Sequence, residues 1–356
     1  MSELLTHGGD WAGFLSERGK LPLDFSASIS PLGVPGGVRA AVRQAAGQMD
    51  RYPDPLCRAL RESISEYELV PPQQILCGNG AAELIFRVVW ALRPRQALVT
   101  APTFSEYGAA LQSVGCAVKT WSLPEKRDFR LEEGVLDAIT PETDLVFLCE
   151  PNNPTGVTAG RPLLLQILRR CRETGTRLVL DECFGDLLDD PESHTLKGEL
   201  EAYPNLLILK AFTKLYAMAG IRLGYALCAD RALLERMYLA GQPWSVSVPA
   251  QAAGAAALRE TAYRERVRSL VRRERPCLAK RLGTLGLRVV PGEANYLLFQ
   301  SPVSLGEPLA RRGILLRSCD NYIGLDETWY RTAVRTRRQN QRLVISYSRL
   351  TVLNCG

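Results

Sequence analysis

A lysine and an arginine follow one short apolar run of this 356-residue chain, and both could take part in chemistry. The run Leu206–Leu209 predicts a buried strand, Lys214 comes shortly after it, and Arg222 follows. A lysine in surroundings of low dielectric constant has a lowered pKa, so its neutral amine can attack an aldehyde. Two cations at the end of a buried strand also favour an anionic ligand there. A surface loop with both charges solvated by water would fit the same stretch.

A glycine turn earlier in the chain is suited to binding a phosphate group. Gly78 and Gly80 follow an expected strand, and a helix is expected to begin at Ala81. Free backbone N–H groups at a helix N-terminus attract anions, and glycine allows the ligand to come close. A dinucleotide site would need a third glycine and an acidic residue after the next strand, which ends instead at Ala101-Pro102. We therefore expect a phosphate site without a nicotinamide cofactor.

Two more expected strands end in polar residues. Asn153 lies between two prolines after the strand Leu145–Cys149, and Asp181 follows the strand Arg177–Leu180. The prolines fix the backbone and present the Asn153 amide rigidly, although a structural turn would look similar. A partly buried aspartate needs a cation, and a protonated pyridine nitrogen is one. A helix cap or a surface ion pair is the alternative for Asp181.

Taken together, these strand ends provide amide groups for a phosphate, an amide donor, a carboxylate for a ring nitrogen and a lysine for an aldehyde. This combination matches one cofactor, pyridoxal phosphate.

The composition limits the class of protein. Hydrophobic residues make up 46% of the chain and charged residues 23%, as in ordinary globular proteins, and the net charge of +6 is spread along the sequence. This favours small anionic molecules over nucleic acid as partners. Ten cysteines without a C-x-x-C pair, and only two histidines, argue against metal sites and disulfides. With no apolar N-terminal segment or membrane-spanning run, we expect a cytoplasmic protein that does not bind membranes.

The apolar periodicity predicts an α/β fold with two domains. Seven strands alternate with helices such as 81–92 and 163–173, which indicates a largely parallel sheet. We expect an irregular N-terminal arm over residues 1–35, a large domain over 36–245 and a smaller α+β domain over 246–356. The tail 343–356 alternates more like a strand than a helix. The expected strands are Gln74–Cys77, Ala97–Thr100, Ala117–Trp121, Leu145–Cys149, Arg177–Leu180, Leu206–Leu209 and Tyr225–Cys228.

The motifs GNGAAE, PTFSEY, PNNPTG, DECF and TKLYAMAGIRLGY follow one another in an order that resembles the fold-type I aminotransferase superfamily, in its histidinol-phosphate aminotransferase branch. Within that branch, HGGD, DFSASISPLG, RYPD, PWSVS, EANYLL, LLRSCDNYIGLD and WYRTAVRTRRQN resemble the threonine-phosphate decarboxylases of cobalamin biosynthesis. The resemblance extends from His7 to about Asn340. It implies pyridoxal 5'-phosphate, a mostly parallel seven-stranded sheet in the large domain, and a homodimer.

The resemblance also implies roles for single residues in cofactor binding. Lys214 would bind the cofactor aldehyde, Asp181 would pair with the ring nitrogen, and Asn153 would donate to the phenolic oxygen. Tyr107 would stack on the ring, and Lys214, Asp181 and Tyr107 form the expected catalytic set. The cofactor phosphate would be held by Gly80, Ala81, Thr213 and Arg222.

Three further positions complete the expected cofactor site. Either Tyr216 or Phe184 would lie near the ring. Tyr52 would reach the cofactor phosphate of the neighbouring subunit, which makes the homodimer the functional unit.

For the substrate, the resemblance assigns Arg331 to the carboxylate. The phosphate ester is left to His7, Arg317 and Arg335, because forked guanidinium groups suit both anions. In the arm, this chain has Ser28 and Ser30 where the family is rich in asparagine, so the substrate end of the pocket differs.

The expected reaction is decarboxylation of O-phospho-L-threonine to (R)-1-amino-2-propanol O-2-phosphate, by a PLP-dependent carboxy-lyase. The alternatives are decarboxylation of O-phospho-L-serine and transamination of histidinol phosphate. Histidinol phosphate has no carboxylate, so Arg317, Arg331 and Arg335 together would provide one cation more than that substrate needs. A non-catalytic pyridoxal-phosphate-binding module and a nucleotide-binding protein are more distant alternatives.

Overall fold

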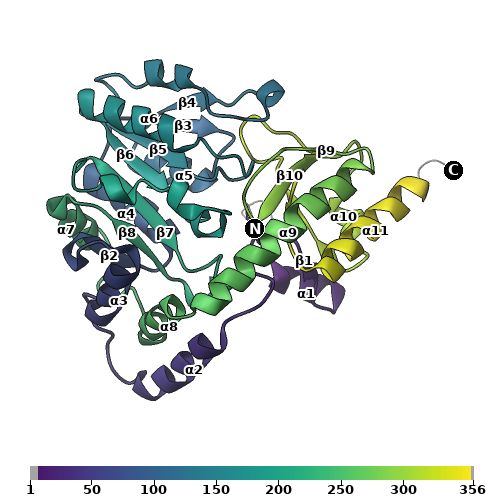
Figure 1. Ribbon diagram of the computed structural model, residues 1–356, viewed down its shortest axis with the longest axis horizontal. Helices are drawn as coiled ribbons and strands as arrows, with labels where there is room; N and C mark the ends of the chain where they lie inside the picture. Colours follow the sequence, from purple (N-terminus) through teal and green to yellow (C-terminus); the bar gives the residue numbers. More distant parts are fainter. Residues whose placement is uncertain (1–6, 354–356) are drawn as a thin grey trace.

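The computed structural model describes residues 7–353, with side chains up to residue 350. Its centre is a seven-stranded sheet with the strand order β2-β8-β7-β6-β5-β3-β4 (Figure 1). Strand β8 runs antiparallel to both of its neighbours, β2 and β7, the other neighbouring strands are parallel, and the predicted fold class is confirmed. The strands are β2 Ile75–Gly78, β3 Gln96–Ala101, β4 Ala117–Ser122, β5 Leu145–Cys149, β6 Arg177–Asp181, β7 Leu206–Ala211 and β8 Gly224–Leu227.

Helices cover both faces of this sheet, because alternate residues of each central strand point to opposite sides. In β6, Leu178 and Leu180 belong to one core and Val179 to the other. The second core is covered by α4 (Ala81–Leu92), α5 (Ser105–Gln112) and α7 (Arg231–Leu239). The first is covered by α3 Arg58–Glu68, α6 Arg161–Glu173, α8 Val248–Leu258 and part of α9 Thr261–Gly283, with α2 Gly36–Ala45 packed on α8.

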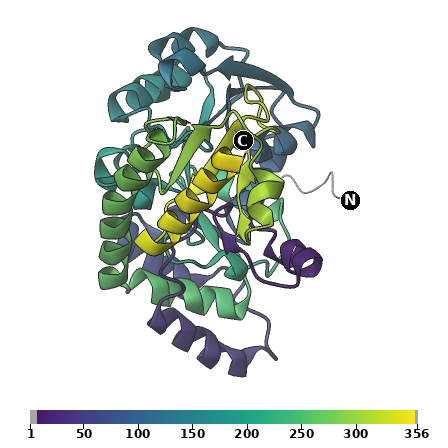
Figure 2. The ribbon, with the colours of Figure 1, turned by 90° about the vertical axis from the view of Figure 1, so that its right-hand side faces the viewer.

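A second, smaller unit contains a four-stranded sheet with the order β12-β13-β10-β9. Figure 2 shows α9 and α11 (Arg337–Leu353) side by side on this unit. Its strands and short helix are β9 Arg288–Val289, β10 Tyr296–Gln300, α10 Gly306–Ala310, β11 Ile314–Leu315, β12 Arg317–Ser318 and β13 Trp329–Ala333.

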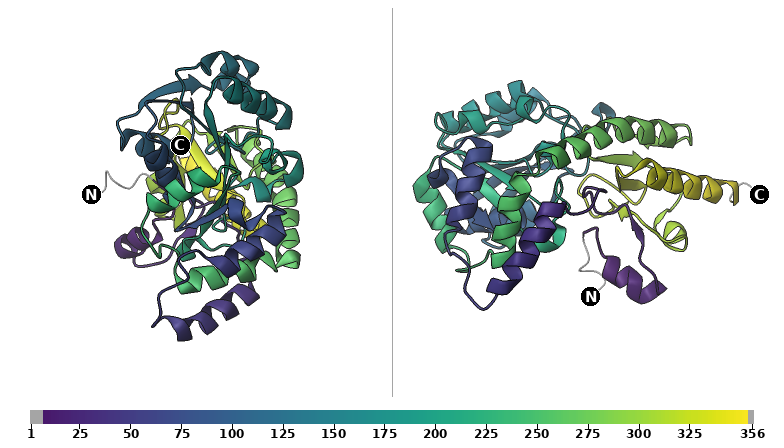
Figure 3. Two further views of the ribbon diagram at one scale, coloured as in Figure 1. Left: turned by 90° about the vertical axis from the view of Figure 1, so that its left-hand side faces the viewer. Right: turned by 60° about the horizontal axis from the view of Figure 1, so that its bottom comes forward.

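The N-terminal arm has more regular structure than its sequence suggests. It contains α1 (Trp11–Arg18) and β1 (Leu23–Asp24), and β1 pairs in parallel with β11. Phe25 is fully buried in the core of the small unit. Figure 3 shows α1 in purple beside this unit, so the arm belongs to it by packing.

The packing also changes where we propose the domain boundary. We expected it at residue 245, but Ala250 and Ala253 of α8 are buried in the core of the large unit. Within α9, Val267 packs in that same core, whereas Leu278 and Leu282 pack in the core of the small unit. We therefore propose that the division falls inside α9.

The expectation of a strand-like tail is wrong over the described residues. Residues 337–353 form the helix α11, and Leu343, Tyr347 and Leu350 follow each other at spacings of four and three. This spacing places all three on one helix face, which packs in the core of the small unit. In the part of the chain that the structure describes, no helix has both the length and the apolar character needed to cross a membrane.

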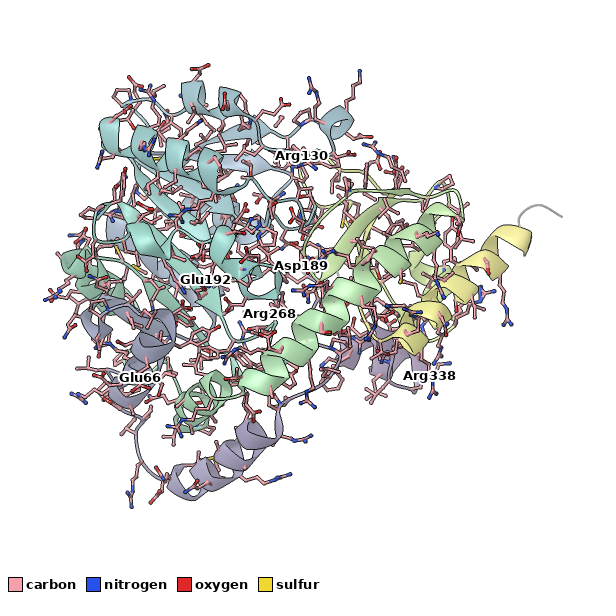
Figure 4. The ribbon with its side chains drawn as sticks, viewed as in Figure 1. Glu66, Arg130, Asp189, Glu192, Arg268 and Arg338 are labelled. Atoms are coloured by element: carbon pink, nitrogen blue, oxygen red, sulfur yellow. The ribbon has the colours of Figure 1, made fainter. Side chains whose placement is uncertain are left out.

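A buried charge cluster stabilises the large unit. Lys210 of β7 lies 2.9 Å from an Asp186 carboxylate oxygen, 3.5 Å from one of Glu182 and 3.8 Å from one of Glu68. Tyr225 donates a hydrogen bond to Glu68. Burial opposes the charge, yet the three carboxylates hold the pKa of Lys210 well above its usual value. Arg268, labelled in Figure 4, ties this cluster to α9 by donating to the Asp186 carbonyl oxygen.

Replacing Lys210 by methionine should destabilise the protein strongly, because it leaves buried carboxylates without their cation. We expect the free energy of unfolding to fall by about 3–5 kcal/mol in denaturant titrations. The control is Lys126→Met, which removes an exposed lysine and should change stability by about 0.5 kcal/mol or less. Equal effects of the two substitutions would contradict a structural role for Lys210.

Candidate active site

A cavity of about 380 Å³ lies at the carboxyl ends of the central strands, and both units contribute to its wall. The large unit provides the ends of β5, β6 and β7 and the first turn of α4, whereas the small unit provides β12, β13 and the arm. Ligands of open α/β sheets bind at this edge. The predicted residues that line the cavity are His7, Ser28, Ala81, Asn153, Asp181, Phe184, Thr213, Lys214, Arg222, Arg317 and Arg331.

Lys214 has the setting of an amine nucleophile. Its backbone carbonyl accepts a hydrogen bond from Ser30 (2.9 Å), and its ammonium nitrogen lies 5.2 Å from the centre of the Phe184 ring. No described residue forms a hydrogen bond or ion pair with that nitrogen. Burial, together with the positive charges of Arg331 and Arg222, lowers the pKa of Lys214 to about 8. A substantial fraction of the amine is therefore neutral near pH 8.

Asp181 is a buried carboxylate held by two donors. The Tyr107 hydroxyl donates to one oxygen at 2.6 Å and the Cys183 backbone N–H to the other at 2.9 Å. Among the residues described, none forms an ion pair with Asp181, although its carboxylate lines the cavity. A buried anion of this kind calls for a cationic ligand group.

Tyr107 lies behind Asp181, not on the cavity wall. It is fully buried, and its ring stacks on Phe147 with centroids 4.9 Å apart. The aromatic ring of this segment that lines the cavity is Phe104. Sequence reasoning missed Phe104 because both aromatic residues occur in one short motif, and the motif does not show which of them faces the ligand.

The glycine turn before α4 forms a cradle for an anion. Gly80 has φ +84°, and a Cβ atom placed there would lie 2.8 Å from an Arg222 guanidinium nitrogen. No side chain caps α4, so the N–H groups of its first turn are available to a ligand. Ala81, Thr213 and Arg222 line the cavity beside this turn. A side chain at position 80 would fill the space that the anion needs.

Arg331 joins the two units inside the cavity. It donates to the Asn153 side-chain oxygen and, at 3.0 Å, to the Ser26 carbonyl oxygen of the arm. Tyr322 also donates to the Asn153 oxygen, at 3.4 Å. The Arg331 Nε atom is buried without a partner. Asn153 thus keeps its amide nitrogen for a ligand, and the Arg331 Nε–H remains without an acceptor.

Three more predicted residues lie around the same space. Arg317 packs over the Tyr322 ring at 5.4 Å, and His7 forms a 2.8 Å hydrogen bond with Glu106. The hydroxyl of Ser28 is buried without a partner on the cavity wall. Glu106 and Tyr322 were not expected, because the sequence does not show which loops meet at the cavity.

Several predicted residues lie away from the cavity in this chain. Arg335 donates to the Asp24 carbonyl oxygen (2.8 Å), and Ser30 accepts a hydrogen bond from Tyr263 (2.8 Å). Tyr216 stacks with Tyr263. Tyr52 is 80% exposed and packs against Trp244 on the surface. The structure therefore does not bring Arg335, Ser30, Tyr216 or Tyr52 to the cavity of their own subunit.

Comparisons with known proteins agree with this geometry. The family model for aminotransferases of class I and II matches residues 22–346. The chain is 40% identical to threonine-phosphate decarboxylase of Salmonella typhimurium over 95% of its length and 94% of the relative's. It is 34% identical to histidinol-phosphate aminotransferase of Anaeromyxobacter sp., covering 87% and 86% of the two chains. Histidinol-phosphate aminotransferase from Clostridium acetobutylicum has a similar structure, with a TM-score of 0.86 and 27% identity over 92% of this chain and 98% of that one.

The lowered pKa of Lys214 can be tested on protein without cofactor. An aldehyde probe that reacts with Lys214 can be trapped with borohydride, and the adduct can be located by mass spectrometry. The amount of adduct should increase as the pH rises through about 8. The substitution Arg331→Gln removes a neighbouring positive charge and should move this midpoint upward. A midpoint near the usual lysine value of 10.5 in the unmodified protein would contradict the expected environment.

Proposed function

The chain belongs to the family of class I and II aminotransferases, and from this premise we propose that it decarboxylates O-phospho-L-threonine with pyridoxal phosphate, giving an aminopropanol phosphate. The main support is the pairing of two anion-binding groups in one cavity. Arg331 has a buried donor without a partner, and Arg317 and His7 line the same cavity. An amino acid phosphate carries both a carboxylate and a phosphate ester, which such an arrangement suits.

The residues of the cavity fit pyridoxal phosphate. Asp181 provides a buried carboxylate without a cation, and Lys214 provides an amine whose pKa is lowered. The cradle at Gly80, where a Cβ would meet Arg222, fits a phosphate group. In this proposal Asp181 faces the ring nitrogen, Asn153 donates to the phenolic oxygen, and the first turn of α4 holds the phosphate.

The bound cofactor supplies an aldehyde for the substrate amine and an electron-withdrawing ring. The chain supplies binding and orientation. Arg331 binds the substrate carboxylate, and His7 and Arg317 bind the phosphate ester, so the substrate is held at both ends. Anchoring the distal phosphate provides binding energy that fixes the carboxylate in the orientation for cleavage. Lys214 is the amine that can move a proton at the substrate Cα.

Histidinol-phosphate transamination is the main alternative, because relatives with that name share the fold and much of the sequence. Decarboxylation of phosphoserine is the other. Ser28 lines the cavity and its hydroxyl is buried without a partner, so we propose it as a candidate for sensing the substrate methyl group.

We also propose a homodimer in which Tyr52 reaches the neighbouring cavity. Tyr52 is exposed beside Trp244, and a surface groove next to it is lined by the partly exposed apolar residues Leu56, Leu239 and Trp244. An exposed apolar region of this kind is typical of a protein–protein interface. We propose a second copy of the chain as the occupant, which is what the resemblance to dimeric aminotransferases implies.

The reaction can be assigned with one set of assays. Holoenzyme should release CO2 from phosphothreonine, form no glutamate from 2-oxoglutarate, and turn over histidinol phosphate poorly or not at all. The difference in turnover between phosphothreonine and phosphoserine measures the contribution of the substrate methyl group. The substitution Lys214→Ala should abolish both CO2 release and the borohydride-trapped adduct. Formation of glutamate without CO2 would assign the protein to the aminotransferases instead.

Subunit complementation tests the shared site. Tyr52→Ala and Lys214→Ala should each be nearly inactive as homodimers. In a hybrid dimer, one cavity would carry both substitutions and the other neither, so co-expression should restore about a quarter of the wild-type activity. If Tyr52 acted within its own subunit, the hybrids would remain inactive. Sedimentation would verify that both variants still dimerise.

A further inference from the structure

Among the residues that the structure describes, one polar contact joins the N-terminal arm to α5 at the cavity. The His7 Nε2 atom lies 2.8 Å from a Glu106 carboxylate oxygen, and both residues line the cavity. The His7 ring also packs against Phe104, with ring centroids 5.8 Å apart. Because the arm packs with the small unit and α5 belongs to the large unit, this contact joins the two units across the cavity.

Within the arm, Ser26 holds the segment that carries His7. The Gly9 N–H donates to the Ser26 hydroxyl at 2.7 Å, and a Cβ at Gly8 would lie only 2.4 Å from the Ser26 carbonyl oxygen. The same carbonyl accepts a hydrogen bond from Arg331. The carboxylate-binding arginine and His7 are therefore connected through a few residues of the arm.

The charge of Glu106 is unexpected at this position. A carboxylate on the wall of a cavity that binds an anionic substrate repels that substrate unless the carboxylate is paired. His7 is the only partner that the described residues provide for its side chain. The hydrogen bond from His7 lowers the pKa of Glu106 below its usual value, so the residue is anionic at neutral pH.

We propose that Glu106 is a positioning residue for substrate binding: it holds His7 and the arm over the cavity, and so presents His7 to the phosphate ester. The inference rests on the proposed function for the identity of the substrate, and nothing in the cofactor contacts requires Glu106. In this proposal Glu106 affects substrate binding only by holding His7 in place.

A double-mutant cycle tests this role in holoenzyme. Glu106→Ala should raise the KM for phosphothreonine about 10-fold, the size expected for loss of a charge-assisted hydrogen bond, with a smaller change in kcat. Glu106→Gln keeps an acceptor for His7 and should restore the KM to within about 3-fold of wild type. The double variant His7→Ala, Glu106→Ala should bind substrate no worse than His7→Ala alone.

A second measurement needs no turnover. Hydrogen exchange of residues 7–14, which include the Gly9 N–H, should be faster in Glu106→Ala, whereas exchange in α5 should be unchanged. The matched control is Glu307→Gln, which weakens the ion pair between α1 and α10 at Arg18 and lies outside the cavity. That variant should leave the KM unchanged.

The proposal would be overturned by an unchanged KM in Glu106→Ala, by additive losses in the double variant, or by unchanged exchange in the arm. If Glu106→Gln did not restore substrate binding, the effect of Glu106 would come from its negative charge at the start of α5 and not from its hydrogen bond to His7. That result would also overturn the proposal. If wild-type enzyme does not act on phosphothreonine, the proposed function fails, while the exchange experiment still decides whether Glu106 holds the arm.

Discussion

The Arg331 guanidinium is the group on which the cavity depends. It holds Asn153 of the large unit and the Ser26 carbonyl of the arm, and its charge helps to lower the pKa of Lys214. These effects come from one buried cation placed between the two units. Without it, the arm would lose a contact with the cavity, and the lysine would lose part of what keeps its amine neutral. If Arg331 binds the substrate carboxylate as proposed, substrate recognition and activation of the Lys214 amine are linked through a single side chain.

Strand alternation separates the charges of the site from the charges that stabilise the fold. Asp181 faces the cavity, whereas the next residue, Glu182, faces the opposite side and meets Lys210 of the neighbouring strand. Lys210 is compensated by three carboxylates, while Lys214 has no anionic partner among the described residues. As a result, two lysines four positions apart have pKa values shifted in opposite directions. A change of one residue in the register of β6 would move Asp181 and Glu182 to each other's faces of the sheet.

The sequence predicted the central sheet well, because the sheet is built from short apolar strands, and the polar residues expected after those strands, Asn153, Asp181 and Lys214, line one cavity. The bounds of β5, Leu145–Cys149, agree fully with the expected strand. Elements without such a pattern were missed. Helix α8 is rich in alanine and nearly uniform around its axis, so it shows no apolar face. Likewise, the sequence near Arg335 does not reveal that the Asp24 carbonyl binds its guanidinium, because that contact forms only in the folded chain.

The division of the cavity between the two units explains how one scaffold can serve two reactions. Asp181, Asn153 and Lys214, which fit the cofactor, come from the large unit, whereas Arg331, Arg317 and the arm come from the small unit. Relatives named as decarboxylases and as aminotransferases share sequence over most of the chain. A lysine that can move a proton suits either reaction, so the choice depends on which substituent of Cα the anion-binding groups place for cleavage. In the proposed function two separate anchors fix that orientation, so a small shift of the arm or of Arg331 would change the reaction without any change in the large unit.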